Sequence, residues 1–123
     1  MRILVVDDDP TVLKSCQRVL EPEGFDIYLV PSADEALEAM RDDDFALLLV
    51  DIKMPKRDGI YLMSKIKKEW PDMPIIVMSG YDTEQTVQQA MNTGAAYFIA
   101  KPFTPTELLN AIQKVMKEPG GHN

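Results

Sequence analysis

Residues 3–10 read ILVVDDDP, in which a short apolar run ends in three adjacent aspartates, Asp7, Asp8 and Asp9, followed by Pro10. The apolar run has the length and composition of a buried β-strand, and Asp9 with Pro10 fits the start of a helix. Four further apolar runs of strand length follow, with polar segments of helix length between them: 25–30, 45–50, 74–78 and 97–100. Because strands joined by helical crossovers run parallel, the pattern predicts a doubly wound five-stranded parallel α/β sheet.

The polar segments carry helix signals at their ends. Ser32 with Glu35 three residues later has the form of a capping box, and Thr104 with Glu107 repeats it. Gly94 suits a helix end. These segments are therefore expected to be helices that cover both faces of the sheet.

The composition is that of one folded domain: the chain has 123 residues, 46% of them hydrophobic and 27% charged. We expect the domain to cover residues 1–118, with 119–123 as a flexible tail or the start of a linker.

The formal net charge of -7, without a basic stripe, argues against direct nucleic-acid binding. The single Cys16 is expected in the core. With no signal peptide pattern and no long apolar segment, a cytoplasmic location without membrane contact is expected.

Polar residues follow or end four of the predicted strands. In a doubly wound sheet, ligands bind in the crevice beyond the carboxyl ends of the strands. Asp7 and Asp8 end the first strand, Asp51 ends the third, Ser79 ends the fourth and Lys101 ends the fifth. These side chains are expected to meet at one edge of the sheet.

A second acidic triplet provides a comparison within the same chain. Residues 41–45 read RDDDF, so this triplet precedes an apolar run instead of following one. It is therefore expected at the opposite edge of the sheet, as a solvated charge run without a part in the site.

Three carboxylates in one crevice repel each other and raise the pKa of at least one of them unless a cation compensates. The charges of the three aspartates at the carboxyl edge and of Lys101 sum to -2, which one Mg²⁺ ion would cancel, with Mn²⁺ as the alternative. A metal-neutralised carboxylate can accept a phosphoryl group as an aspartyl-phosphate. The chemistry favours Asp51 as the acceptor, with Ser79 and Lys101 as donors to the phosphoryl oxygens.

Four segments together resemble the motifs of response regulator receiver domains, and the resemblance spans residues 2–117. They are VVDDDP at 5–10, DIKMPKRDG at 51–59, MSG at 78–80 and KPF at 101–103. The resemblance implies the flavodoxin-like strand order 2-1-3-4-5. It also implies a phosphorylation-controlled switch of a two-component system that is not an enzyme but assists its own phosphorylation and dephosphorylation.

The resemblance implies partners as well as a fold. The phosphoryl donor would be the phosphohistidine of a histidine kinase or of a histidine phosphotransfer domain. Signal would leave through the surface formed by the fifth strand and its flanking helices, toward an output domain or protein that the sequence does not identify.

The metal ligands implied by the resemblance are Asp8, the acceptor Asp51 and the main-chain carbonyl of Lys53, with Asp7 acting through water. Lys53 also puts a long cation beside the acceptor, where smaller or acidic residues occur in the family. We therefore expect an altered lifetime of the phosphorylated state, of either sign.

The remaining implied residues are the switch residues and a cis peptide. Ser79 is the hydroxyl that responds to phosphorylation, and Lys101 is the lysine that contacts the phosphoryl group. Phe98 is the mobile aromatic residue, and Tyr97 should point to the other face of the sheet by strand alternation. Pro102 is the candidate for a cis peptide bond with Lys101.

Other classes share parts of this pattern. A haloacid dehalogenase-like phosphohydrolase also uses an aspartyl nucleophile with Mg²⁺, but it normally carries a second aspartate where this chain has Lys53. Turnover of phosphate esters would reveal such a hydrolase.

A flavodoxin-like cofactor binder needs a first loop that binds phosphate, and three aspartates would repel a phosphate group. A degenerate receiver is disfavoured because the acid, hydroxyl and lysine residues are all present.

Overall fold

Five parallel strands form one sheet in the order β2-β1-β3-β4-β5, which confirms the predicted fold class. The computed structural model describes residues 1–53, 59–80 and 83–117; the expected tail at 119–123 lies outside them. The strands are β1 (Arg2–Val6), β2 (Asp26–Val30), β3 (Leu47–Asp51), β4 (Ile75–Ser79) and β5 (Tyr97–Ala100). The helices are α1 (Pro10–Leu20), the 3₁₀ helix η1 (Glu21–Glu23), α2 (Ala33–Asp42), α3 (Gly59–Glu69), α4 (Glu84–Thr93) and α5 (Pro105–Lys117).

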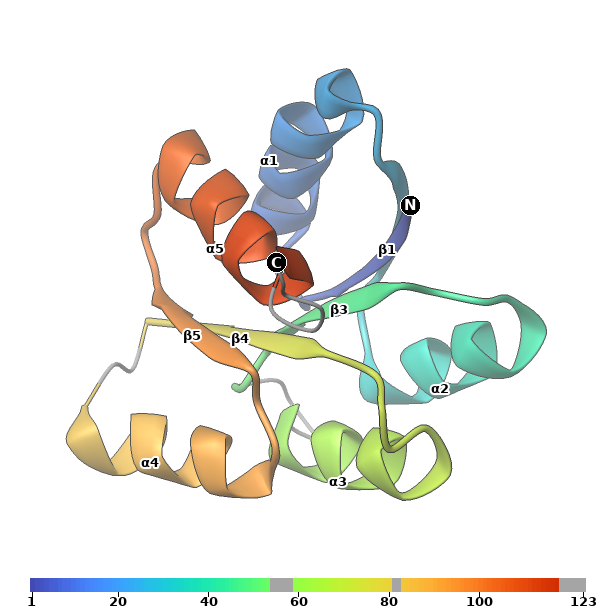
Figure 1. The fold of residues 1–123 in the computed structure, drawn as a ribbon, viewed down its shortest axis with the longest axis vertical. Coiled ribbons are helices and arrows are strands. Elements are labelled where there is room, and N and C mark those ends of the chain that lie inside the picture. Colours follow the sequence, from blue (N-terminus) through green and yellow to red (C-terminus); the bar gives the residue numbers. More distant parts are fainter. Residues whose placement is uncertain (54–58, 81–82, 118–123) are drawn as a thin grey trace.

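The sheet lies between two layers of helices (Figure 1): α1 and α5 cover one face, and α2, α3 and α4 cover the other. Ile3 and Val5 of β1 belong to the core on the α1/α5 side, whereas Leu4 and Val6 belong to the opposite core. All four side chains are fully buried. A strand buried on both faces has to be apolar throughout, which explains the uninterrupted run before Asp7.

None of the helices within residues 1–53, 59–80 and 83–117 combines the length with the apolar character that crossing a membrane requires.

Cys16 lies in the core on the α1/α5 side, as predicted. Burial of the thiol, and in second place the negative charge of Asp7, raise its pKa to about 12. The thiol is therefore a protonated packing group at neutral pH.

The predicted helix ends are present. The Asp9 carboxylate accepts a hydrogen bond from the Thr11 N–H at 2.9 Å and caps α1. The Ser32 hydroxyl accepts one from the Glu35 N–H at 3.2 Å and caps α2. Gly94 ends α4 with φ 113°, a left-handed conformation that glycine adopts without a steric cost.

The second acidic triplet lies at the opposite edge of the sheet, as expected. One of its members has a structural contact that the sequence reading missed, because Asp43 Oδ1 lies 3.3 Å from Arg2 Nη1. Both side chains are more than a third exposed, so this ion pair adds little stability.

Helix α4 is weakly attached to the core. Among its residues only Ala90 is buried, whereas the face with Gln85, Gln88, Gln89 and Asn92 is exposed. A helix with so few buried apolar contacts has a low local stability and can shift at small cost.

The capping box of α5 offers a test of local stability. The Glu107 N–H donates to Thr104 Oγ1 at 3.1 Å, and the Thr104 N–H donates back to Glu107 Oε1 at 2.8 Å. Loss of the cap in Thr104→Ala should lower the free energy of unfolding by about 1 kcal/mol. Urea denaturation measures this change. The control is Thr106→Ala in the same exposed turn; an equal loss there would contradict the capping role.

Candidate functional site

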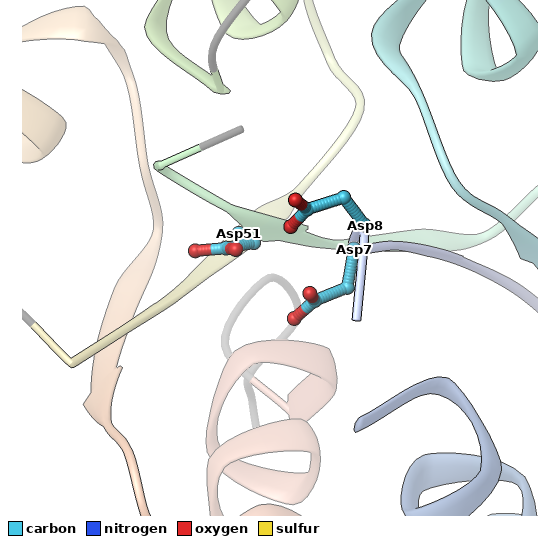
Figure 2. Close-up of side chains that lie close together, drawn as sticks. All are labelled: Asp7, Asp8 and Asp51. Carbon is cyan, nitrogen blue, oxygen red and sulfur yellow. The ribbon is translucent and has the colours of Figure 1, made fainter. Parts of the chain in front are cut away.

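Three carboxylates gather at the carboxyl edge of the sheet (Figure 2). Asp7 and Asp8 directly follow β1, and Asp51 ends the neighbouring β3; the pairing of Val6 with Val50 brings the two strand ends side by side. Each aspartate offers an oxygen within 4.8 Å of those offered by the other two. Asp7 and Asp51 are only 1% and 6% exposed, whereas Asp8 is exposed to solvent.

Lys101 balances part of this negative charge. It follows β5, at the end of the sheet, and its Nζ lies 2.7 Å from Asp7 Oδ2 and 3.4 Å from Asp51 Oδ2. Burial by itself lowers the pKa of Lys101, but the hydrogen bond to Asp7 and the charge of Asp51 outweigh it and raise this pKa above its usual value. The lysine therefore remains charged and links the first strand to the last.

Asp7 is held by the protein on both of its oxygens. Its Oδ1 accepts a hydrogen bond from the Asp9 N–H at 2.9 Å, and its Oδ2 accepts one from Lys101. The exposed carboxylate of Asp8 lies at the mouth of the same cluster. This division fits a direct ligand role for Asp8 and an orienting role for Asp7.

The carboxyl group of Asp51 has a perturbed pKa. Burial, and after it the negative charge of Asp7, raise the pKa of Asp51 from 3.8 to about 6. The Lys53 N–H, which donates to Asp51 Oδ1 at 3.1 Å, and the charge of Lys101 act in the opposite direction. The site therefore carries an uncompensated electrostatic cost that a bound cation would relieve.

The other predicted site residues lie in β4, in β5 or shortly after β5. Ser79 is fully buried at the end of β4, and its carbonyl accepts a hydrogen bond from the Lys101 N–H at 2.8 Å. Phe98 is half-buried on the α3/α4 side, and Tyr97 packs on the α5 side, as strand alternation predicts. The Lys101–Pro102 peptide bond is cis.

One contact within the site was missed in the sequence. The sequence predicts Asp9 only as the start of α1, yet its N–H also orients Asp7. The signal was available, because an aspartate side chain commonly accepts a hydrogen bond from the backbone N–H two residues later. Lys53 repeats this arrangement with Asp51.

The donor set fits the proposed ion. All side chains of the cluster offer oxygen, which Mg²⁺ and Mn²⁺ prefer, and the exposed position of Asp8 leaves a route from solvent. With the three carboxylates ionised and Lys101 protonated, the local charge is -2, which one divalent cation neutralises.

Comparison with known proteins decides the family. The family model of the response regulator receiver domain matches the sequence over residues 3–113. The chain belongs to this family. Receiver domains are the phosphoacceptor modules of two-component response regulators, and the predicted resemblance is thereby confirmed.

Individual relatives agree with this assignment. The receiver domain is 36% identical, over 91% of its length, to the C4-dicarboxylate transport transcriptional regulatory protein DctD of Rhizobium meliloti, and 34% identical, over 93%, to the transcriptional regulatory protein ZraR of Escherichia coli. These matches cover 24% and 26% of the two relatives, so the chain spans about a quarter of their length.

A solved structure shows the same architecture over nearly the whole chain. The CheY-like response regulator receiver domain protein of Methanospirillum hungatei is 37% identical, with a TM-score of 0.90. The match covers 95% of this receiver domain and 94% of that protein.

The raised pKa of Asp51 predicts a pH-dependent stability in metal-free buffer. Because the folded state binds the Asp51 proton more tightly than the unfolded chain does, this residue lowers the free energy of unfolding as pH rises through 3.8 to about 6. At pH 7, Asp51→Asn should raise the free energy of unfolding, by at most about 3 kcal/mol, and at pH 4 the gain should largely vanish.

Urea denaturation across this pH range, with a chelator and then with Mg²⁺, measures the effect. Saturating Mg²⁺ should reduce the gain at pH 7, since the cation stabilises the ionised wild-type site. The exposed Asp42→Asn serves as the control and should leave the pH profile unchanged. An equal gain for Asp51→Asn at pH 4 and pH 7 would contradict the shifted pKa.

Proposed function

We propose that Asp51 is the phosphoacceptor of a two-component signalling switch. The observation that carries this proposal is the position of a buried carboxylate of raised pKa beside an acidic pair and within 3.4 Å of a lysine, all at the carboxyl edge of the sheet. Membership in the receiver domain family supports the same role.

The transfer step is a displacement at phosphorus. An Asp51 carboxylate oxygen forms the new P–O bond, the P–N bond of a phosphohistidine breaks, and the imidazole leaves with the electron pair of that bond. Lys101, which already lies 3.4 Å from Asp51, is positioned to stabilise charge on the phosphoryl oxygens. In the unphosphorylated protein the same lysine keeps its shorter contact with Asp7.

Mg²⁺, or Mn²⁺ in its place, would be held by Asp8, Asp51 and the main-chain carbonyl of Lys53, with Asp7 in an outer position. The ion supplies positive charge against both the carboxylates and the phosphoryl oxygens. The chain's own contribution is to hold Asp7 and Lys101 in place by hydrogen bonds, and of the three carboxylates Asp8 is the exposed one.

The switch would consist of Ser79 and Phe98. A phosphoryl group on Asp51 would attract the Ser79 hydroxyl, and Phe98 would repack on the α3/α4 side of β5. Helix α4, with its single buried side chain, is the element most easily displaced. Signal would then leave through β5 and its flanking helices.

Water is expected to attack the phosphorus at the same site, so that the domain assists its own dephosphorylation. Lys53, two residues after Asp51, has an exposed side chain, and we expect it to change the lifetime of the phosphorylated state. The phosphoryl donor is proposed to be a histidine kinase or a histidine phosphotransfer domain.

The relatives suggest where the signal goes. DctD and ZraR are named as transcriptional regulators, and in each of them the matching part is a minor portion of the chain. We propose that this domain acts on an output domain or protein without contacting nucleic acid itself, since its net charge is -7. The single free Cys16 fits a reducing compartment, so the proposed location is the cytoplasm.

Acceptance of a phosphoryl group can be measured by intact mass after incubation with a small phosphodonor. Wild-type protein should gain the mass of one phosphoryl group in the presence of Mg²⁺ and little without it, because the acceptor is otherwise surrounded by negative charge. Asp51→Asn should gain none. Asp43→Asn is the control at the opposite edge and should behave as wild type. Modification of Asp51→Asn at the wild-type rate would falsify the assignment.

Two further substitutions separate metal binding from the response. Asp8→Ala should lose the phosphorylation that Mg²⁺ stimulates, because the substitution removes the exposed ligand of the ion. Lys101→Ala should still allow phosphorylation but weaken the conformational change, because the contact that links the end of β5 to the phosphoryl group is lost. The measurements are the rate of mass gain at several Mg²⁺ concentrations and the NMR shifts of α4 and β5 amides. Wild-type behaviour of either variant would argue against its role.

A further inference from the structure

The first residue of α3 packs directly on the backbone of the acceptor. Gly59 is buried, and a Cβ atom built on it would lie 2.7 Å from the Cα of Ile52, 3.1 Å from the carbonyl carbon of Asp51 and closer still to the Asp51 carbonyl oxygen. All three neighbours are main-chain atoms, which cannot rotate away as the end of a side chain can. The contact therefore leaves no room for any side chain at position 59.

Hydrogen bonds hold the same stretch from two sides. The Ile52 N–H donates to the Met78 carbonyl of β4 at 3.2 Å, and the Ile52 carbonyl accepts from the Gly59 N–H at 3.0 Å. Ile52, the residue after the acceptor, is thus hydrogen-bonded both to β4 and to the start of α3. The next residue, Lys53, donates its N–H to Asp51 Oδ1, so the backbone path also sets the direction of the carboxylate.

We infer that Gly59 is a positioning residue for the phosphoacceptor: its bare backbone sets the place of Asp51 and of the Lys53 main chain relative to the other carboxylates. This inference rests on the proposed role of Asp51. Gly59 thereby determines part of the geometry of the site although it has no reactive side chain of its own.

A methyl group at this position should displace the acceptor backbone by about 1 Å, and a misplacement of that size at a reacting group lowers a rate by roughly 100-fold. Gly59→Ala is therefore expected to fold but to be phosphorylated roughly 10- to 100-fold more slowly. It should also bind Mg²⁺ more weakly, and the metal-free protein should show shifted amide resonances for Asp51, Ile52 and Lys53.

The matched control is Gly24→Ala. Gly24 has φ 94°, so alanine is strained there and lowers stability. Within the described part of the chain, no atom beyond the two neighbouring residues lies within 4 Å of its added Cβ, and the residue ends η1, far from the site. Gly24→Ala should therefore lose stability while it keeps the wild-type phosphorylation rate and Mg²⁺ affinity. If Gly59 had a merely structural role, Gly59→Ala would resemble Gly24→Ala: it would lose stability but keep the wild-type phosphorylation rate and Mg²⁺ affinity.

Intact mass gives the phosphorylation rate, and an NMR titration of each variant with Mg²⁺ alone gives the metal affinity. Wild-type values of both quantities in Gly59→Ala, or equal losses in Gly24→Ala, would overturn the inference. If wild type itself accepts no phosphoryl group, the proposed function fails, and the Mg²⁺ affinities still test the position of the carboxylates.

The measurement remains informative if Gly59→Ala does not fold in buffer. Trimethylamine N-oxide favours the folded state, and the same comparison can be made in its presence. In wild type, hydrogen exchange provides an independent test, because the hydrogen bond to Ile52 requires the Gly59 amide to be protected as strongly as the core amides of β3. Free exchange of this amide would also overturn the inference.

Discussion

Two buried carboxylates, Asp7 and Asp51, share one lysine, and the need to balance their charge organises the carboxyl edge of the sheet. Lys101 forms the shorter contact with Asp7. This contact raises the pKa of Lys101 and leaves the negative charge of Asp51 incompletely compensated. Burial and the remaining repulsion then raise the pKa of Asp51. A site with this imbalance is prepared for a cation, and afterwards for a group that brings further oxygen ligands.

The framework that permits such burial is apolar and continuous. β1, β3 and β4 are central strands covered on both faces, so the acids at the carboxyl ends of β1 and β3 rest on a packed core that moves little. Helix α4 differs, since only Ala90 anchors it. A rigid site next to one weakly held element allows a local change of charge to become a change of surface.

Much of the fold and of the candidate site could be predicted because several strong local patterns in the sequence indicate the same architecture. Apolar runs of strand length alternate with capped helices, and the parallel sheet that follows from them places Asp7, Asp51 and Lys101 at one edge. Contacts between distant segments gave weaker signals. The pairing of Asp43 with Arg2 depends on how the end of α2 meets β1, and no local pattern indicates it.

The sequence by itself determined the strands, the helix ends and the identity of the residues at the carboxyl edge, because these follow from periodicity, capping and the direction of parallel strands. Only the tertiary structure decided how the charges are shared. Distances and burial determine that Lys101 contacts Asp7 more closely than Asp51, that Asp8 alone of the three acids is exposed, and that Gly59 packs on the backbone of Asp51 and Ile52. Such properties depend on separations of a few ångströms between residues distant in the chain, which a linear pattern does not specify.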